Sequence, residues 1–249
     1  MYKYFFSFFF AQMILSATLL GDSVSNDSLI FLGKSPVKEV LLTILRDRST
    51  NCSDFQDAAN ILSQLLSFKV GEFVATEKKE VQTLTGATFK DGQQLKKNPI
   101  LVTVWRSGLS LLPAFQNLFK GASVGMVGIK RNEETAEPML YYLNFPSIVA
   151  DDQIIILEPM LATGGSLHLT ISLLKERGAS EENIIIATVI AAPQGVERLQ
   201  KEFPKIRIVL AALDPQLNEV NYIVPGLGDF GDRYFGNDSE PDFESMAAG

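Results

Sequence analysis

The chain has 249 residues, 29 of them acidic and 22 basic, with a formal net charge of −7, one cysteine (Cys52) and one histidine (His168). This length is enough for one large α/β core without staples. A lone cysteine excludes an internal disulfide, and a lone histidine excludes a structural zinc site of the Cys/His type. The negative charge argues against nucleic-acid binding, because contact with the phosphate backbone needs a basic surface.

The two ends of the chain differ in composition from the rest. Residues 1–20 carry Lys3 and an apolar run rich in phenylalanine, and the polar segment 21–28 follows. This pattern resembles a secretory signal and has the length of a short membrane span, about 17 to 25 residues. An upstream start codon, or an extension without a targeting role, is the alternative. We therefore expect one domain over residues 29–237, with a disordered acidic tail at 238–249.

Two amphipathic helices are predicted near the start of the domain. Apolar residues recur at helical spacing over residues 36–46, and a second stripe follows Asp54 and runs towards Gly71. Residues 76–98 are polar and contain Gly86 and Asp91-Gly92 as turn signals, so they predict irregular structure or an edge hairpin.

After Pro99, short apolar runs alternate with helical patterns. The predicted strands cover residues 100–104, 124–129, 154–157, 184–190 and 206–211, and the predicted helices cover residues 109–119, 166–177 and 196–203. Uninterrupted apolar strands separated by helices are typical of a parallel sheet that is covered on both faces. The sequence therefore predicts a doubly wound α/β fold that binds its ligands at the carboxyl ends of the strands.

The most informative segment is IIILEPMLATGGS at residues 154–166, where an apolar strand runs into Glu158, a loop of small residues and a helix start. Such a loop lets successive backbone N–H groups converge on an anion, and Thr163 and Ser166 add hydroxyl donors. Glycine suits it because phosphate must approach the backbone closely and because such loops often need a positive φ. A carboxylate at the strand end could accept hydrogen bonds from ribose hydroxyls.

A structural reading of the same loop stays open at this point. Gly164-Gly165 could merely turn the chain from strand to helix, with Ser166 as the capping residue. The sequence has neither a P-loop GxxxxGK[ST] nor a Rossmann GxGxxG at this place.

The segment resembles the motif with which phosphoribosyltransferases bind 5-phospho-α-D-ribose 1-diphosphate (PRPP), most closely that of the uracil phosphoribosyltransferases. The family motif reads DPMLATGGS, and eight of nine positions match in EPMLATGGS at residues 158–166. VWRSG at 104–108 is similar to the family's xxRAG, and KRNEET at 130–135 is similar to YRxEET. Further counterparts lie at 42–50, 191–199 and 217–236, so the resemblance covers about residues 29–236.

This resemblance implies a type I phosphoribosyltransferase fold with a small irregular or β hood over the site, and formation of UMP and diphosphate from uracil and PRPP. It assigns catalysis to Arg106, Arg131 and Asp229. The residues that it assigns to PRPP are Arg106, Arg131, Glu158, Pro159, Met160, Leu161, Ala162, Thr163, Gly164, Gly165, Ser166 and Asp229. The residues that it assigns to uracil are Ile223, Gly228, Asp229 and Phe230.

The reaction expected from the resemblance displaces diphosphate from the anomeric carbon and needs positioning and charge stabilisation, not a protein nucleophile. Mg²⁺ is the expected cofactor, bound through PRPP and not by protein side chains. The charged residues 130–138 are the predicted mobile cover, and His168 is expected on a helix surface. A homo-oligomer, GTP as an effector and a cytoplasmic location are further expectations.

Four positions depart from the family motifs: Ser107 replaces alanine, Lys130 tyrosine, Glu158 aspartate, and Phe230 the alanine of GDAGD. If Phe230 pointed into the pocket it could exclude uracil, whereas if it pointed away the backbone contacts to the base would survive. Two alternatives to the salvage enzyme therefore stay open. One is a regulatory homologue that binds PRPP or a nucleotide without turnover, and the other is a phosphoribosyltransferase for another base.

Overall fold

The computed structural model describes residues 28–131 and 138–237. The predicted signal-like start of the chain, the acidic tail and the centre of the predicted cover at 130–138 lie outside the described residues. Within the described ranges, no helix is long and apolar enough to cross a membrane.

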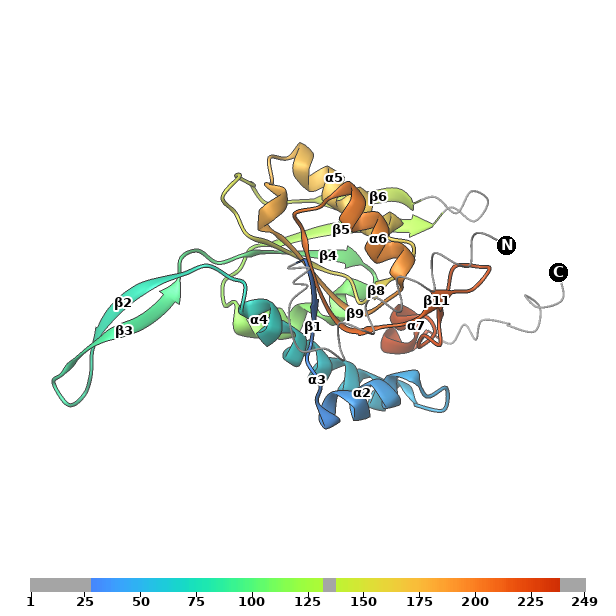
Figure 1. Ribbon diagram of the computed structural model, residues 1–249, viewed down its shortest axis with the longest axis horizontal. Coiled ribbons are helices and arrows are strands. Elements are labelled where there is room, and N and C mark those ends of the chain that lie inside the picture. Colours follow the sequence, from blue (N-terminus) through green and yellow to red (C-terminus); the bar gives the residue numbers. More distant parts are fainter. Residues whose placement is uncertain (1–27, 132–137, 238–249) are drawn as a thin grey trace, which may run out of the picture.

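A mixed sheet of eight strands forms the centre of the domain (Figure 1). Its strands are β1 (Leu29–Phe31), β4 (Ile100–Trp105), β5 (Val124–Arg131), β6 (Pro138–Asn144), β7 (Ile154–Leu157), β8 (Met160–Leu161), β9 (Ile184–Ala191) and β10 (Arg207–Leu213). The order is β1-β10-β9-β7-β4-β5-β6, with β8 beside β9. All neighbours are parallel except β5 and β6.

Helices cover both faces of this sheet (Figure 1). One face carries α5 (Gly165–Glu176) and α6 (Pro193–Glu202), and the other carries α2 (Pro36–Arg46), α3 (Cys52–Gly71) and α4 (Leu112–Leu118). Side chains of β7 alternate between two hydrophobic clusters, with Ile154 and Ile156 in one and Ile155 and Leu157 in the other. This period of two, with every residue of the strand buried, is the pattern of a strand enclosed on both faces. The predicted doubly wound α/β fold is confirmed.

Most predicted elements are present, with shifted ends. The clearest difference is the single helix expected over residues 109–119, which is a short 3₁₀ helix, η1 (Ser107–Ser110), followed by α4. Pro113 lies in the first turn of α4, where a missing N–H is tolerated, so a helix starts there more readily than it continues.

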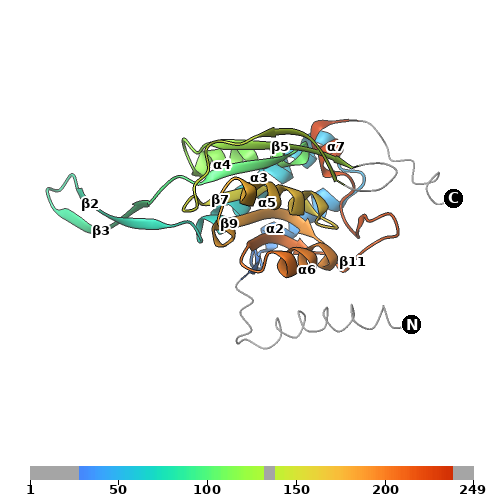
Figure 2. The ribbon, with the colours of Figure 1, turned by 90° about the horizontal axis from the view of Figure 1, so that it is seen from above.

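Residues 76–98 form a hairpin of β2 (Thr76–Gln82) and β3 (Thr88–Leu95) that projects from the body of the protein (Figure 1; Figure 2). The hairpin prediction is confirmed, but these strands make their own two-stranded sheet and are not an edge of the central sheet. All residues of β2 are exposed, since its polar sequence offers no face to bury.

Candidate functional site

The site lies at the topological switch point of the sheet, where the connections from two neighbouring strands leave in opposite directions. β4 and β7 are parallel neighbours, and the chain continues from β4 to β5 on one side and from β7 to β9 on the other. Loops that leave such a pair in opposite directions open a crevice at the carboxyl ends of the strands. Arg106 follows β4 and Glu158 follows β7, so both residues reach this crevice.

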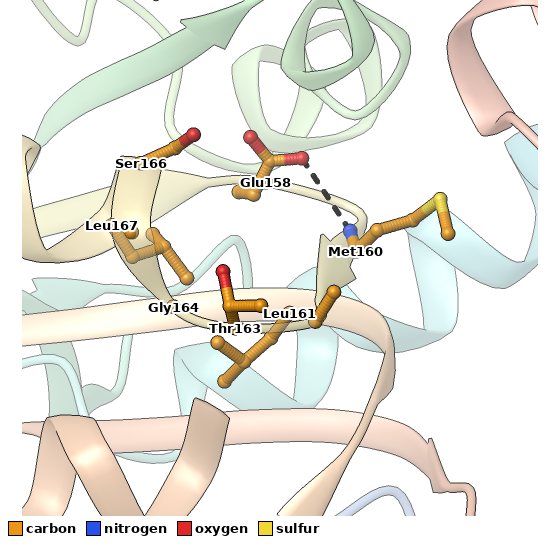
Figure 3. A pocket seen from close by; sticks show the side chains of 9 residues that line it. Glu158, Met160, Leu161, Thr163, Gly164, Ser166 and Leu167 are labelled. Carbon is orange, nitrogen blue, oxygen red and sulfur yellow. Dashed lines mark hydrogen bonds between the residues drawn. The ribbon is translucent and has the colours of Figure 1, made fainter. Parts of the chain in front are cut away.

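A cavity of about 160 Å³ lies beside the loop that follows β7 (Figure 3). Its lining is Glu158, Met160, Leu161, Ala162, Thr163, Gly164, Gly165, Ser166 and Leu167. The predicted PRPP loop thus borders the cavity, apart from Pro159. The carbonyl of Pro159 instead accepts hydrogen bonds from the backbone N–H groups of Val189 and Ile190, at 2.9 and 3.1 Å, and ties the loop to β9.

Gly164 shapes the loop. Its φ of 77° is left-handed, and a Cβ at this position would lie 3.3 Å from the carbonyl oxygen of Gly195. Gly164, and not Ser166, is the N-cap of α5, so the reading of Ser166 as the capping residue is wrong. The hydroxyls of Thr163 and Ser166 and the carboxyl of Glu158 point to the same side of the loop (Figure 3). This arrangement offers donors and a carboxyl to one ligand.

The carboxyl of Glu158 is nearly buried, with 8% of the residue exposed. Its Oε1 accepts a hydrogen bond from the Ser107 hydroxyl at 2.9 Å and one from the backbone N–H of Met160 at 3.5 Å. Burial raises the pKa of Glu158 to about 8, and the Asp229 carboxylate adds to the rise, whereas the two hydrogen bonds oppose it. Without a ligand, the group is therefore mostly protonated at neutral pH.

The two predicted arginines end neighbouring strands of the sheet. Arg106 is exposed and forms an ion pair with Asp232, and its guanidinium lies 5.9 Å from the ring centre of Phe235. An exposed ion pair contributes little to stability, so Arg106 can exchange it for an anionic ligand. Arg131 is the last residue of β5, where its backbone pairs with Pro138, and its side chain lies outside the description.

Residues 214–236, called the base segment because they contain the predicted uracil-binding positions, approach the site at Asp229, whose carboxylate acts on Glu158. They contain two short strands, β11 (Gln216–Leu217) and β12 (Ile223–Val224), and one short helix, α7 (Phe230–Phe235). Ile223 is 5% exposed, and its side chain packs in the core. Gly228 has a φ of 80°, and Asp229 caps α7 by accepting a 2.8 Å hydrogen bond from the backbone N–H of Asp232.

Phe230 points into the hydrophobic core and away from the crevice. The residue has no exposed surface, and its ring meets that of Phe55 edge to face at 5.2 Å between centres. Its ring also stacks against Tyr234 at 6.1 Å. The side chain thus anchors α7 on α3 and cannot obstruct a base, which answers the question that this departure raised.

Comparison with known proteins agrees with this geometry. The family model described as uracil phosphoribosyltransferase matches residues 32–237. The chain belongs to the uracil phosphoribosyltransferase family. It is 41% identical to the uracil phosphoribosyltransferase of Streptococcus equi subsp. zooepidemicus over 201 residues, which are 81% of this chain and 95% of that protein. The uracil phosphoribosyltransferase of Acholeplasma laidlawii is 37% identical with the same coverage.

Among solved structures, the AQ2163 protein from Aquifex aeolicus has the same overall fold as this family member. The TM-score is 0.75 at 31% identity, and the match covers 84% of this chain and 98% of that one. The resemblance first found in residues 158–166 therefore extends through the whole folded domain.

One ion pair and one set of arginine–carbonyl hydrogen bonds that the sequence did not reveal hold the base segment of this uracil phosphoribosyltransferase family member. Arg46 forms a bidentate pair with the buried Asp214, at 2.5 and 2.7 Å, and donates to the carbonyl of Gly226 at 2.8 Å. Asp214 also accepts from the N–H of Gly226 at 2.8 Å. Arg233 donates to the carbonyl of Leu227 at 2.7 Å. Arg46 and Asp214 are 168 positions apart, so no local spacing in the sequence connects them. Only one hint was present in the sequence: Arg46 lies in residues 42–50, a segment that has a counterpart in the family.

The remaining ionisable groups that the structure describes offer no built metal site. In the described part of the chain, no group of three or more histidine, cysteine, aspartate or glutamate residues could hold a metal ion. His168 lies on α5 and its Nε2 is 2.5 Å from Glu202 Oε2, which links α5 to α6. That contact gives His168 a structural partner. His168 is not among the residues that line the cavity.

Proposed function

We propose that the protein transfers the phosphoribosyl group of PRPP to uracil and so forms UMP and diphosphate. One observation carries the proposal: a loop shaped for phosphate and a nearly buried carboxyl border one cavity at the crevice between β4 and β7. A sugar phosphate presents both of the groups that such a cavity can bind, whereas free phosphate presents only one. Membership of the family supports uracil as the acceptor.

In this proposal the loop from Ala162 to Ser166 binds the 5-phosphate, since the hydroxyls of Thr163 and Ser166 face one side (Figure 3) and the loop leads into the N-terminus of α5. Glu158 accepts hydrogen bonds from the ribose hydroxyls. Arg106 and Arg131 bind the diphosphate, and guanidinium groups suit this role because they can donate two hydrogen bonds to neighbouring phosphate oxygens.

Magnesium fits this site only as part of the substrate. The nearby carboxylates of Glu158 and Asp229 supply oxygen ligands of the kind that Mg²⁺ prefers. Among the described residues, however, they belong to no cluster that could hold a metal ion. The ion would be held by the diphosphate oxygens and would stabilise the charge on the leaving group.

The base would be read by the main chain of Ile223, Gly228, Asp229 and Phe230. Burial of the Ile223 and Phe230 side chains supports this reading, because it leaves backbone N–H and C=O groups for the edge of a planar base. The exposed carboxylate of Asp229 is close enough to Glu158 to raise its pKa, so Asp229 would face both PRPP and uracil.

Further properties follow from the resemblance and stay predictions. They are assembly into a homo-oligomer, response to GTP, a cytoplasmic location, and the division of the chain into segments 1–28, 29–237 and 238–249.

The experiment that tests the function measures UMP formation from labelled uracil and PRPP with Mg²⁺, using the full chain. Turnover should disappear in Arg106→Ala and in Asp229→Asn. Arg177→Ala is the matched control, because Arg177 is exposed at the far end of α5. If PRPP binds and another base is converted while uracil is not, the protein is a phosphoribosyltransferase for that base. If PRPP binds and no base reacts, the regulatory reading replaces the enzyme.

A further inference from the structure

Ser107 lies where three segments of the site meet. It follows Arg106 after β4, and its hydroxyl donates to Glu158 at the end of β7. On another side it approaches α7, because a Cβ added at Gly231 would lie 3.7 Å from the Cβ of Ser107. No other serine hydroxyl among the described hydrogen bonds contacts Glu158.

The turn that carries Ser107 is held close to the strand end that carries Glu158. A Cβ at Gly108 would lie 2.2 Å from the carbonyl oxygen of Leu157, so η1 packs directly on the end of β7. The Ser110 hydroxyl donates to the carbonyl of Ser107 at 2.7 Å. The close packing at Gly108 holds the backbone of Ser107 within hydrogen-bond reach of Glu158.

Both hydrogen bonds described for the Glu158 carboxyl end on Oε1. Oε2 is therefore the oxygen left for a ligand in the cavity that Glu158 borders. Glutamate has one more rotatable bond than aspartate, and ordering that bond costs conformational entropy. A donor that restrains Oε1 lowers this cost before the ligand arrives.

We propose that Ser107 is a positioning residue that orients the Glu158 carboxyl for the ribose hydroxyls of PRPP, and that the two residues act as a pair. Both are positions at which the sequence departs from the family motifs, and the structure joins them by a hydrogen bond. Alanine at position 107 could not make this contact. The identity of the ligand rests on the proposed function.

The test begins with binding of Mg²⁺-PRPP in the absence of any base, measured by calorimetry. Ser107→Ala should raise the dissociation constant about tenfold, the effect of losing one hydrogen bond. In turnover, KM for PRPP should rise and KM for uracil should not. Ser107→Thr keeps the hydroxyl and should restore the affinity. Ser110→Ala is the control, because it removes a hydroxyl from the same turn without touching Glu158.

A double-mutant cycle with Glu158→Asp tests the pairing. Ser107→Ala should cost about tenfold in PRPP affinity beside Glu158 and little beside Asp, because the shorter side chain does not depend on the serine. Equal losses in both backgrounds would overturn the inference. A loss in Ser110→Ala as large as that in Ser107→Ala would also overturn it, since the role would then be only to support the turn.

The outcomes separate this inference from the proposed function. If PRPP binds and the cycle shows coupling but no UMP forms, the function fails and the pairing stands. If UMP forms and the cycle is additive, the pairing fails and the function stands. A chain that binds no PRPP overturns both.

Discussion

The loop at residues 158–166 and the base segment at residues 214–236 lie on the same rim of the sheet, yet they are held in different ways. The first is held by its own neighbourhood, with Gly164 turning the chain and Pro159 bonding to the next strand, β9. The second has two strands of two residues and a helix of six, and distant side chains hold it. Arg46 and Phe55 come from α2 and α3.

This difference predicts different responses to substitution. The backbone of the loop at residues 158–166, called the phosphate loop for its proposed role, should change conformation mainly when its own residues change, because its geometry is set locally. Ser107 acts on the Glu158 side chain and not on this backbone. The base segment should fail when residues far from the ligand change, because its short elements cannot hold their conformation alone. Mutations in each region, compared by stability and by the two KM values, test the contrast.

The largest effect on stability is expected from Phe230→Ala. Removing a fully buried ring between α3 and α7 should lower the free energy of unfolding by about 4 kcal/mol, measured by chemical denaturation. Uracil turnover should not increase, since the ring does not face the crevice. Phe68→Ala, at an exposed position of α3, is the control with a small expected change. A gain in turnover would contradict the observed orientation.

Arg46→Ala should follow, with a loss of about 3 kcal/mol, because it leaves the buried Asp214 without its cation. Freed from its anchor at Gly226, the base segment should bind uracil more weakly, so KM for uracil should rise while PRPP binding changes little. Arg48→Ala, two residues away and exposed, provides the comparison. Equal rises in both KM values would show that the two regions are not held independently.

A smaller effect is expected within the phosphate loop. Gly164→Ala places a side chain at a φ of 77° and should destabilise the protein by about 1 to 2 kcal/mol, with weaker PRPP binding and an unchanged KM for uracil. Gly165→Ala adds the same methyl group without that strain, because the φ of Gly165 is not left-handed. The atoms nearest to an added Cβ at Gly165 are 3.7 Å away. Thermal unfolding of both variants should therefore separate them, and equal shifts would contradict local control of the turn.

The smallest effect is a pH dependence of PRPP affinity. With the pKa of Glu158 raised to about 8, only the ionised fraction can accept both ribose hydrogen bonds, so affinity should fall about fivefold from pH 8 to pH 7. Glu158→Gln should lack this transition while keeping any that belongs to PRPP itself. Calorimetry at several pH values measures it, and identical profiles in both proteins would rule out Glu158 as the titrating group.

The same carboxyl should make folding stability depend on pH. Its pKa is higher in the folded chain than the usual 4.5, so the folded state binds the extra proton between these two values. The unliganded protein should therefore lose stability as pH rises from about 4.5 to about 8, and Glu158→Gln should remove that part of the slope.

Local patterns in the sequence predicted the architecture and singled out the loop at residues 158–166, which borders the cavity. Apolar runs mark the buried parallel strands, and the EPMLATGGS segment identifies the family, because each signal lies within a few neighbouring residues. The prediction failed where the pattern was short or exposed. β1 has three residues, β6 is mostly exposed at the sheet edge, and α7 has six residues that include Gly231.

Tertiary structure alone decided what surrounds each site residue. Phe230 could point either way by sequence, and its packing against Phe55 settles the direction. Ser107 and Glu158 are 51 positions apart, and Arg46 and Asp214 are 168 apart, so no local spacing connects them. Hydrogen bonding and burial depend on groups that meet only when the chain has folded, and for that reason the pKa of Glu158 and the anchoring of the base segment could not be predicted from the sequence.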